Sequence, residues 1–171
     1  MTIFTPIPQS QFLADIRALA TALGRDIWTP DFLIGIGRGG LVPAVFLSHA
    51  TGLPMLSVDF SSQVEDFSDA PLVRLAARTR AGERLLFLDD INDTGRTIAQ
   101  LRRTLTAAGA VADGIRFATL LDNIRSGERV DYRAREIDRA VTKDWFIFPW
   151  EAVAPEAAIQ LDAAAVPERT A

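Results

Sequence analysis

Apolar residues along this chain fall into two alternating patterns, short continuous runs and longer stretches with helical spacing. The continuous runs include Phe32–Ile36 and Leu85–Leu88, each bounded by turn or charged residues. Such runs are typical of strands that are buried on both faces of a parallel sheet. Helical spacing is clearest from Ser10, a candidate N-cap, to Leu23, with Gly24 as the expected stop. The pattern therefore predicts strands and helices in alternation.

Further elements follow along the chain by the same criteria. They are strands at Leu53–Phe60, Ile115–Leu121, Asp131–Ile137 (an edge strand) and Trp145–Phe148, a helix from Ile98 that Gly109 ends, and a loose helix or frayed tail beyond Ala152. This order favours an α/β fold with a mainly parallel central sheet flanked by helices. The length of 171 residues fits a single domain. We expect its core at about 30–122, a small hood formed by the N-terminal segment and about 123–155, and a tail at 156–171.

The composition argues against several classes of protein. The formal net charge is −4 and no basic tract is present, which disfavours a nucleic-acid partner. Cysteine is absent, so neither a disulfide framework nor thiolate chemistry is available. No apolar run approaches the length of a membrane span, and the N-terminus lacks the pattern of a secretion signal. We therefore expect a cytoplasmic protein that binds neither membrane nor nucleic acid.

The densest chemical signal is the segment RLLFLDDINDTGRT at 84–97. Asp89 and Asp90 follow the apolar run directly, and Asp93 comes shortly after them. Thr94–Thr97 then combine hydroxyls with a glycine and open a helix, where backbone N–H groups and the helix dipole favour a phosphate. Carboxylates beside that phosphate suit a ligand with sugar hydroxyls and a divalent cation. The segment therefore predicts a site for a phosphorylated sugar with a metal ion.

A glycine-rich segment, Gly35–Gly40 (GIGRGG), follows the expected strand at 32–36, with Pro43 near the start of the next helix. Together with Asp59 it matches a dinucleotide-binding fingerprint, which would make the protein a nicotinamide-dependent oxidoreductase. The alternative is a pyrophosphate loop, because the segment contains a cation, Arg38. An arginine inside a glycine loop suits a pyrophosphate that leaves as an anion, and we favour this interpretation.

The motif at 89–97 resembles the phosphoribosyl pyrophosphate (PRPP) loop of type I phosphoribosyltransferases. The resemblance implies a type I phosphoribosyltransferase-like fold, in which Asp89 and Asp90 bind the ribose hydroxyls and hydrated Mg²⁺. It implies that Asp93 is catalytic, either taking a proton from the base or acting electrostatically. By the same resemblance the PRPP-binding residues of this loop are Asp89, Asp90, Asp93, Thr94, Gly95, Arg96 and Thr97.

The glycine-rich segment is similar to the pyrophosphate loop of the same family. The resemblance implies that Gly37, Arg38 and Gly39 bind PRPP, that Arg38 stabilises the leaving pyrophosphate during catalysis, and that the Gly37–Arg38 peptide bond is cis. It also implies that the polar stretch Ser61–Pro71 is a lid over the reaction centre. Candidates for further pyrophosphate contacts, among which the sequence does not choose, are Arg74, Arg78 and Arg80.

The segment DWFIFPWE at 144–151 resembles the base-recognition segment of the small bacterial and archaeal 6-oxopurine enzymes, the xanthine/guanine/hypoxanthine type. Accordingly Trp145 would stack on the base, the Phe146 backbone would contact the purine edge, and Glu151 would lie near the exocyclic position or a metal. Family members carry a lysine just after the fifth strand that donates to the 6-oxo group, whereas this chain has Asn123 there. We expect Asn123 to bind the base as a weaker, uncharged donor.

The resemblance implies an Mg²⁺-dependent transfer of the 5-phosphoribosyl group from PRPP to a nucleobase nitrogen, with a purine as the expected base. The partners would be PRPP, the purine base, the nucleoside monophosphate and pyrophosphate, and the protein would be a cytoplasmic homo-oligomer in base salvage. One alternative is a non-catalytic regulator of the same fold that senses PRPP or a nucleotide. The other is the dinucleotide-dependent oxidoreductase.

Overall fold

Five strands form the central sheet, in the order β3-β2-β4-β5-β6, and every pairing in it is parallel. The structure is a computed structural model that describes residues 2–59 and 70–165. The strands are β2 (Phe32–Ile36), β3 (Met55–Val58), β4 (Leu85–Asn92), β5 (Ile115–Asn123) and β6 (Tyr132–Ile137). The expected α/β fold with a mainly parallel sheet is confirmed. All carboxyl ends of the strands therefore lie along one edge, where such sheets bind ligands.

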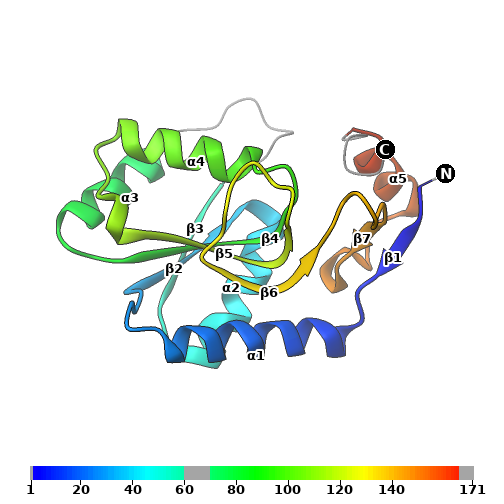
Figure 1. Ribbon diagram of the computed structural model, residues 1–171, viewed down its shortest axis with the longest axis horizontal. Helices are drawn as coiled ribbons and strands as arrows, with labels where there is room; N and C mark the ends of the chain where they lie inside the picture. Colours follow the sequence, from blue (N-terminus) through cyan, green and yellow to red (C-terminus); the bar gives the residue numbers. More distant parts are fainter. Residues whose placement is uncertain (1, 60–69, 166–171) are drawn as a thin grey trace.

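Helices cover both faces of this sheet (Figure 1). They are α1 (Gln9–Arg25) and α2 (Gly37–Thr51) on one face, and α3 (Ala70–Arg80) and α4 (Arg96–Ala107) on the other. Leu85–Leu88 of β4 are fully buried, because Leu86 and Leu88 pack under α1 and α2 while the other two side chains pack under α3 and α4. Burial on both faces explains why this run is continuously apolar. No helix within the described ranges combines the length and the apolar character needed to cross a membrane.

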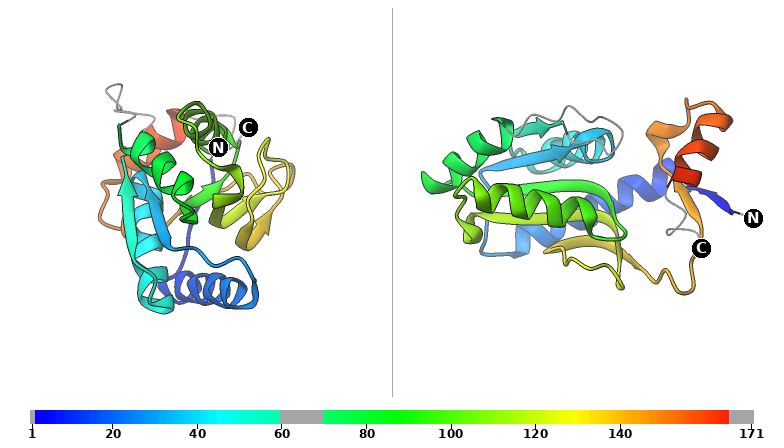
Figure 2. Two further views of the ribbon diagram at one scale, coloured as in Figure 1. Left: turned by 90° about the vertical axis from the view of Figure 1, so that its left-hand side faces the viewer. Right: turned by 90° about the horizontal axis from the view of Figure 1, so that it is seen from above.

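The hood lies beyond the carboxyl ends of the central strands, as Figure 1 and the view from above in Figure 2 show. Its elements are β1 (Phe4–Pro6), β7 (Trp145–Ile147) and the one-turn 3₁₀-helix η2 (Pro149–Glu151), and α5 (Glu156–Ala165) follows it. β1 and β7 pair in parallel, so segments from the two ends of the chain form one small sheet. The Trp150 ring stacks on Phe148, with centroids 4.8 Å apart, and meets Phe12 of α1 edge-on at 5.5 Å. These ring contacts pack the hood against the core.

The helix boundaries correct several expectations. α1 begins before Ser10, which is therefore not its N-cap, and it continues through Gly24 to its last residue. α2 begins at Gly37, so the expected glycine loop is the first helical turn, and Pro43 lies inside the helix. The expected cis Gly37–Arg38 bond is wrong, because no peptide bond among the described residues is cis. The positive φ of Gly37, 52°, instead turns the chain from strand to helix.

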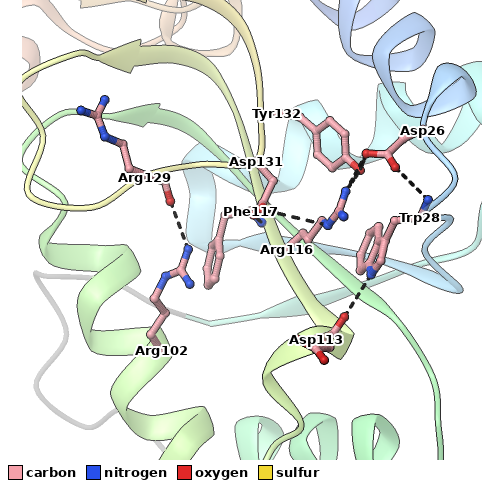
Figure 3. A network of polar contacts seen from close by, with 9 residues as sticks. All are labelled: Asp26, Trp28, Arg102, Asp113, Arg116, Phe117, Arg129, Asp131 and Tyr132. Carbon is pink, nitrogen blue, oxygen red and sulfur yellow. Dashed lines mark hydrogen bonds and ion pairs between the residues drawn. The ribbon is translucent and has the colours of Figure 1, made fainter.

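At the amino-terminal ends of the strands, Arg116 joins three segments of the chain (Figure 3). Its guanidinium donates to the Asp26 carboxylate (2.6 Å) and to the Tyr132 hydroxyl, which itself donates to Asp26 (2.8 Å). The guanidinium also lies 4.6 Å from the centre of the Trp28 ring, whose indole donates to the 3₁₀-helix η1 (Ala112–Gly114). The Trp28 backbone N–H, then Tyr132 and Arg116, stabilise the charged carboxylate and lower the pKa of Asp26 from 3.8 to about 2.

Replacing Asp26 with asparagine should lower the free energy of unfolding at neutral pH, because Arg116 and Tyr132 lose their charged acceptor. A carboxylate with a lowered pKa stabilises the fold above its unfolded-state value of 3.8, and this contribution is lost as the pH falls toward about 2. The difference between wild type and Asp26→Asn in urea unfolding should therefore narrow on acidification through that window. A difference that stayed constant would contradict the ionised carboxylate as its cause.

Candidate functional site

The carboxyl end of β4 extends beyond its neighbour β2 and carries two carboxylates. β2 pairs with β4 only as far as Leu88, whereas β5 accompanies it to Asn92. Asp89 and Asp90 therefore lie within the strand, which is longer than its apolar run predicts. Pairing with β5 on one side alone fixes their backbone and leaves the other edge of this segment to α2.

The first turn of α2 packs directly against that edge of β4. A Cβ atom at Gly40 would lie 1.9 Å from the carbonyl oxygen of Leu88, and one at Gly39 would lie 2.6 Å from Oδ2 of Asp90. Gly40 has no room for a side chain because it faces backbone, whereas a side chain at Gly39 would require the Asp90 carboxylate to turn aside. The N-cap of α2 makes no side-chain hydrogen bond. The glycines thus bring an amino-terminal helix end, with its free N–H groups and positive dipole, into contact with a carboxylate of the site.

A second helix begins on the other side of these carboxylates. Gly95 is the N-cap of α4, with a φ of 87° and no side-chain capping hydrogen bond. A Cβ atom at Gly95 would lie 2.7 Å from the backbone nitrogen of Glu128, so the left-handed turn and the close approach both require glycine. The Thr94 hydroxyl lies 3.4 Å from the backbone nitrogen of Arg96. Thr94–Thr97 therefore form the turn that suits a phosphate.

Asn92, which no motif in the sequence singles out, supports this turn through hydrogen bonds. Its amide nitrogen donates to Asp122 Oδ1 (2.7 Å) and to the Glu128 carbonyl oxygen (2.8 Å), and its amide oxygen accepts from the Ser126 hydroxyl (2.9 Å). The side chain is buried, and burial raises the pKa of the Asp122 carboxyl that it contacts. The amide connects the end of β4 to the segment after β5. A buried-type strand position occupied by an amide was the available signal in the sequence.

Asp93 is buried and bound by a residue from the hood, Arg139. The guanidinium donates through Nε to Oδ1 (3.0 Å) and through Nη2 to Oδ2 (2.7 Å), and only 3% of the Asp93 side chain is exposed. A bidentate pair of this kind is the strongest type of side-chain hydrogen bonding to a carboxylate. No local motif in the sequence identifies Arg139. Both oxygens of Asp93 are therefore engaged before any ligand binds.

Asn123 lies beside this ion pair and not in the lining of the pocket described below. Its amide nitrogen donates to the Asp93 carbonyl oxygen (2.9 Å), and its amide oxygen accepts from the backbone N–H groups of Arg125 and Arg139, each at 3.2 Å. Asn123 is 6% exposed. Asn123 thus supports the backbones of Asp93 and Arg139, and the base contact expected of it stays a prediction.

A pocket of about 90 Å³ lies between the end of β4 and the hood. It contains three of the four residues expected to bind a base, Trp145, Phe146 and Glu151, together with two of the expected PRPP residues, Asp90 and Asp93. Among the described residues, the pocket is lined by Asp90, Ile91, Asp93, Arg139, Trp145, Phe146, Phe148 and Glu151. Residues that are distant in the sequence thus surround one space with aromatic walls and a polar edge.

Glu151 is held in place by its own helical turn. Its Oε2 accepts from the backbone N–H of Phe148 at 2.7 Å. Burial raises the pKa of the Glu151 carboxyl, and the charge of Asp162 adds to this, while the Phe148 N–H and the positive charge of Arg38 act in the opposite direction.

The three arginines of α3 do not share one environment. Arg78 pairs with Glu83 (2.8 Å), and Arg80 donates to the carbonyl oxygens of Ala108 (2.7 Å) and Gly109. These partners precede β4 and follow α4, so both arginines lie at the end of the sheet opposite the pocket. Arg74 is exposed nearer the start of α3. The expected lid at Ser61–Pro71 falls outside the described residues except for its last two positions, which begin α3.

Comparisons with known proteins give a consistent picture. A family model described as the phosphoribosyl transferase domain matches residues 8–156. A xanthine-guanine phosphoribosyltransferase of Idiomarina loihiensis is 29% identical over 122 residues, covering 70% of each chain. The crystal structure of a purine phosphoribosyltransferase from Pyrococcus horikoshii is 28% identical with a TM-score of 0.63, covering 88% of this chain and 96% of its own. The Helicobacter pylori xanthine-guanine-hypoxanthine phosphoribosyltransferase shares the fold, with 18% identity, a TM-score of 0.64 and coverage of 94% and 99%.

Gly40→Ala should destabilise the protein by about 1–3 kcal/mol, because the added methyl group forces α2 away from β4. Urea unfolding measures the loss. Gly24→Ala is the matched control, since a Cβ there meets nothing within 4 Å, and it should be neutral or stabilise α1 by about 0.5–1 kcal/mol. Equal stabilities for the two variants would refute the close contact between α2 and β4.

Proposed function

This chain belongs to the phosphoribosyl transferase domain family, and we propose that it transfers the 5-phosphoribosyl group of PRPP to a purine base in cytoplasmic base salvage. A ring nitrogen of the base bonds to C1 of the ribose while the bond from C1 to pyrophosphate breaks; pyrophosphate leaves, and the proton of the base nitrogen passes to solvent. The observation that carries the proposal is the pair of helix N-termini, without side-chain caps, on either side of Asp89 and Asp90. No contact within the described residues favours the regulator or the oxidoreductase over this reaction.

PRPP matches the two helix ends because it carries anions at both ends of a sugar. The 5′-phosphate binds the N–H groups and hydroxyls of Thr94–Thr97 at the start of α4. The pyrophosphate binds Gly37, Arg38 and Gly39 at the start of α2, where Arg38 supplies a mobile positive charge. Between them the carboxylates of β4 accept hydrogen bonds from the ribose hydroxyls.

The carboxylates of Asp89 and Asp90 also suit Mg²⁺. The described residues contain no cluster of three or more metal-binding side chains. Two adjacent carboxylates fit a Mg²⁺ ion that takes its remaining oxygen ligands from water and from substrate phosphates. When bound, the ion supplies positive charge to the leaving pyrophosphate.

Catalysis then rests on positioning and electrostatics. Arg38 stabilises the negative charge that develops on the pyrophosphate, and the carboxylates near the ribose favour positive charge at C1. The bidentate contact with Arg139 supports an electrostatic role for Asp93 over proton transfer, because both of its oxygens already accept hydrogen bonds. The base stacks on Trp145 beside Phe146, and Glu151 lies at the edge of the same pocket.

Changing both Asp89 and Asp90 to asparagine should abolish turnover while leaving the fold intact, because these side chains serve the ligands at the strand end. Steady-state transfer with PRPP, Mg²⁺ and a panel of purines and pyrimidines is the measurement, with circular dichroism to verify folding. Asp113→Asn, at the opposite end of the sheet, is the control. Turnover within about twofold of wild type for the double variant would refute the assigned PRPP site.

Arg38→Ala should weaken PRPP binding about tenfold or more and nucleoside monophosphate binding much less, because only PRPP carries pyrophosphate. Calorimetric titration of both ligands gives the two ratios. Arg78→Ala removes an arginine at the far end of the sheet and should change neither. Equal losses for both ligands in Arg38→Ala would place this arginine at the 5′-phosphate instead.

A further inference from the structure

Arg139 holds a fixed position at the edge of the base pocket. It lies in the connection between β6 and β7, is 9% exposed, and its guanidinium carbon lies 5.3 Å from the centre of the Phe146 ring. Nη1 donates to the carbonyl oxygens of Thr142 (3.2 Å) and Asp144 (2.6 Å), while Nε and Nη2 bind Asp93. The side chain is therefore held on three sides, which fixes its orientation toward the pocket that it lines.

A count of donors leaves one N–H group for a ligand. A guanidinium carries five N–H groups: one on Nε and two on each terminal nitrogen. Nε–H is shared by the two oxygens of Asp93, both Nη1 hydrogens meet carbonyl oxygens, and one Nη2 hydrogen meets Asp93 Oδ2. The second Nη2 hydrogen meets no acceptor among residues 2–59 and 70–165. Arg139 lines the pocket, and this N–H is the donor of its guanidinium that the described residues leave for a ligand.

Asn123 helps to hold Arg139 and Asp93 in place through their backbones. Its amide oxygen holds the backbone of Arg139, and its amide nitrogen holds the backbone of Asp93. A lysine at this position has no acceptor and could not bind the two N–H groups that Asn123 binds. Asn123, the residue that departs from the family pattern, therefore helps to position Arg139.

The charges of the residues that line the pocket indicate which group the Arg139 donor binds. Of the lining residues that the structure describes, Arg139 is the one cation, and Asp90, Asp93 and Glu151 are the acidic members. Asp93 is already paired with Arg139, so the ion pair presents to the pocket a donor that carries partial positive charge. An exocyclic oxygen on a base stacked against Trp145 is the complementary group, whereas an exocyclic amine would face donor to donor.

We propose that Arg139 is the specificity-determining residue of the site, and that its Nη2–H group binds the exocyclic oxygen of an oxopurine. This inference deepens the proposed function and rests on it. Arg139 supplies the charge that Asn123 lacks, and Asp93 acts as the anchor of that guanidinium. The result is a preference for oxopurines over aminopurines that comes from the hood and not from the end of β5.

The test compares hypoxanthine with adenine, which differ by an oxo group in place of an amine. In Arg139→Met, kcat/KM for hypoxanthine should fall about tenfold or more, while that for adenine should change by about twofold or less. Arg139→Lys, which keeps the charge, should retain most of the preference. Arg125→Met, which breaks an exposed ion pair with Asp138 in the same region, is the control and should change neither value.

Two further measurements separate specificity from folding. Arg139→Met leaves the buried carboxylate of Asp93 without its partner, so Asp93→Asn combined with Arg139→Met removes that charge as well. Binding of inosine and adenosine monophosphates to this double variant requires no turnover and should show the same loss of preference. Equal losses for both bases and both nucleotides would reduce Arg139 to a structural residue and overturn the proposal.

The Asn123→Lys change has opposite expected effects under the two possible assignments of the charged donor. If the charged donor belongs at the end of β5, this change should improve the use of hypoxanthine. If Arg139 is the donor, the change removes the acceptor that holds Arg139 and should lower it. An increase would overturn the proposal, whereas failure of the wild type to use any base would overturn the proposed function itself, and nucleotide binding distinguishes the two.

Discussion

The close packing of α2 against β4 is the constraint on which the site depends. Gly39 and Gly40 have no side chains, so the first turn of the helix reaches the backbone of Leu88 and the carboxylate of Asp90. A methyl group at Gly40 would separate the helix from the strand, because it would meet the Leu88 carbonyl oxygen. The proposed PRPP site needs the two helix N-termini at a fixed spacing around the carboxylates of β4, so it depends on this contact. The same glycines that resemble a flexible loop in the sequence thus serve a rigid contact.

The ion pair between Asp93 and Arg139 adds a second constraint, which joins the phosphate turn to the hood. A buried pair contributes little net stability, but removing one partner costs about 3–5 kcal/mol, because a charge stays buried without compensation. The pair therefore fixes the geometry between the two parts that form the base pocket. At the amino-terminal ends of the strands, far from the proposed ligand site, Arg116 and Asp26 form another ion pair that joins separate segments of the chain (Figure 3). The contacts of Arg116 and Asp26 thus lie at the end of the sheet opposite the proposed ligand site.

The predictions from sequence succeeded where the signal was local. The strand Phe32–Ile36 was predicted to the residue, and the predicted helix from Ile98 buries Ile98, Leu101 and Leu105. They failed where an element depended on a neighbour. β4 continues to Asn92 because β5 pairs with it, and the turn at Gly37 became helical because β4 offers a surface for it. Neither the strand hydrogen bonds that extend β4 nor the contact that makes the turn at Gly37 helical produces a hydrophobic period in the residues concerned.

The sequence by itself determined the α/β class and the apolar runs that become parallel strands, because burial on both faces demands apolar residues in consecutive positions. It also contains the residue types of the loop at 93–97 that we propose binds a phosphate. Only the tertiary structure decided the composition of the base pocket. Arg139 meets Asp93 across 46 residues of chain, and Asn123 is turned toward their backbones. Which polar groups are already satisfied, and which donor remains for a ligand, follows from the distances between segments, and a linear sequence does not contain these distances.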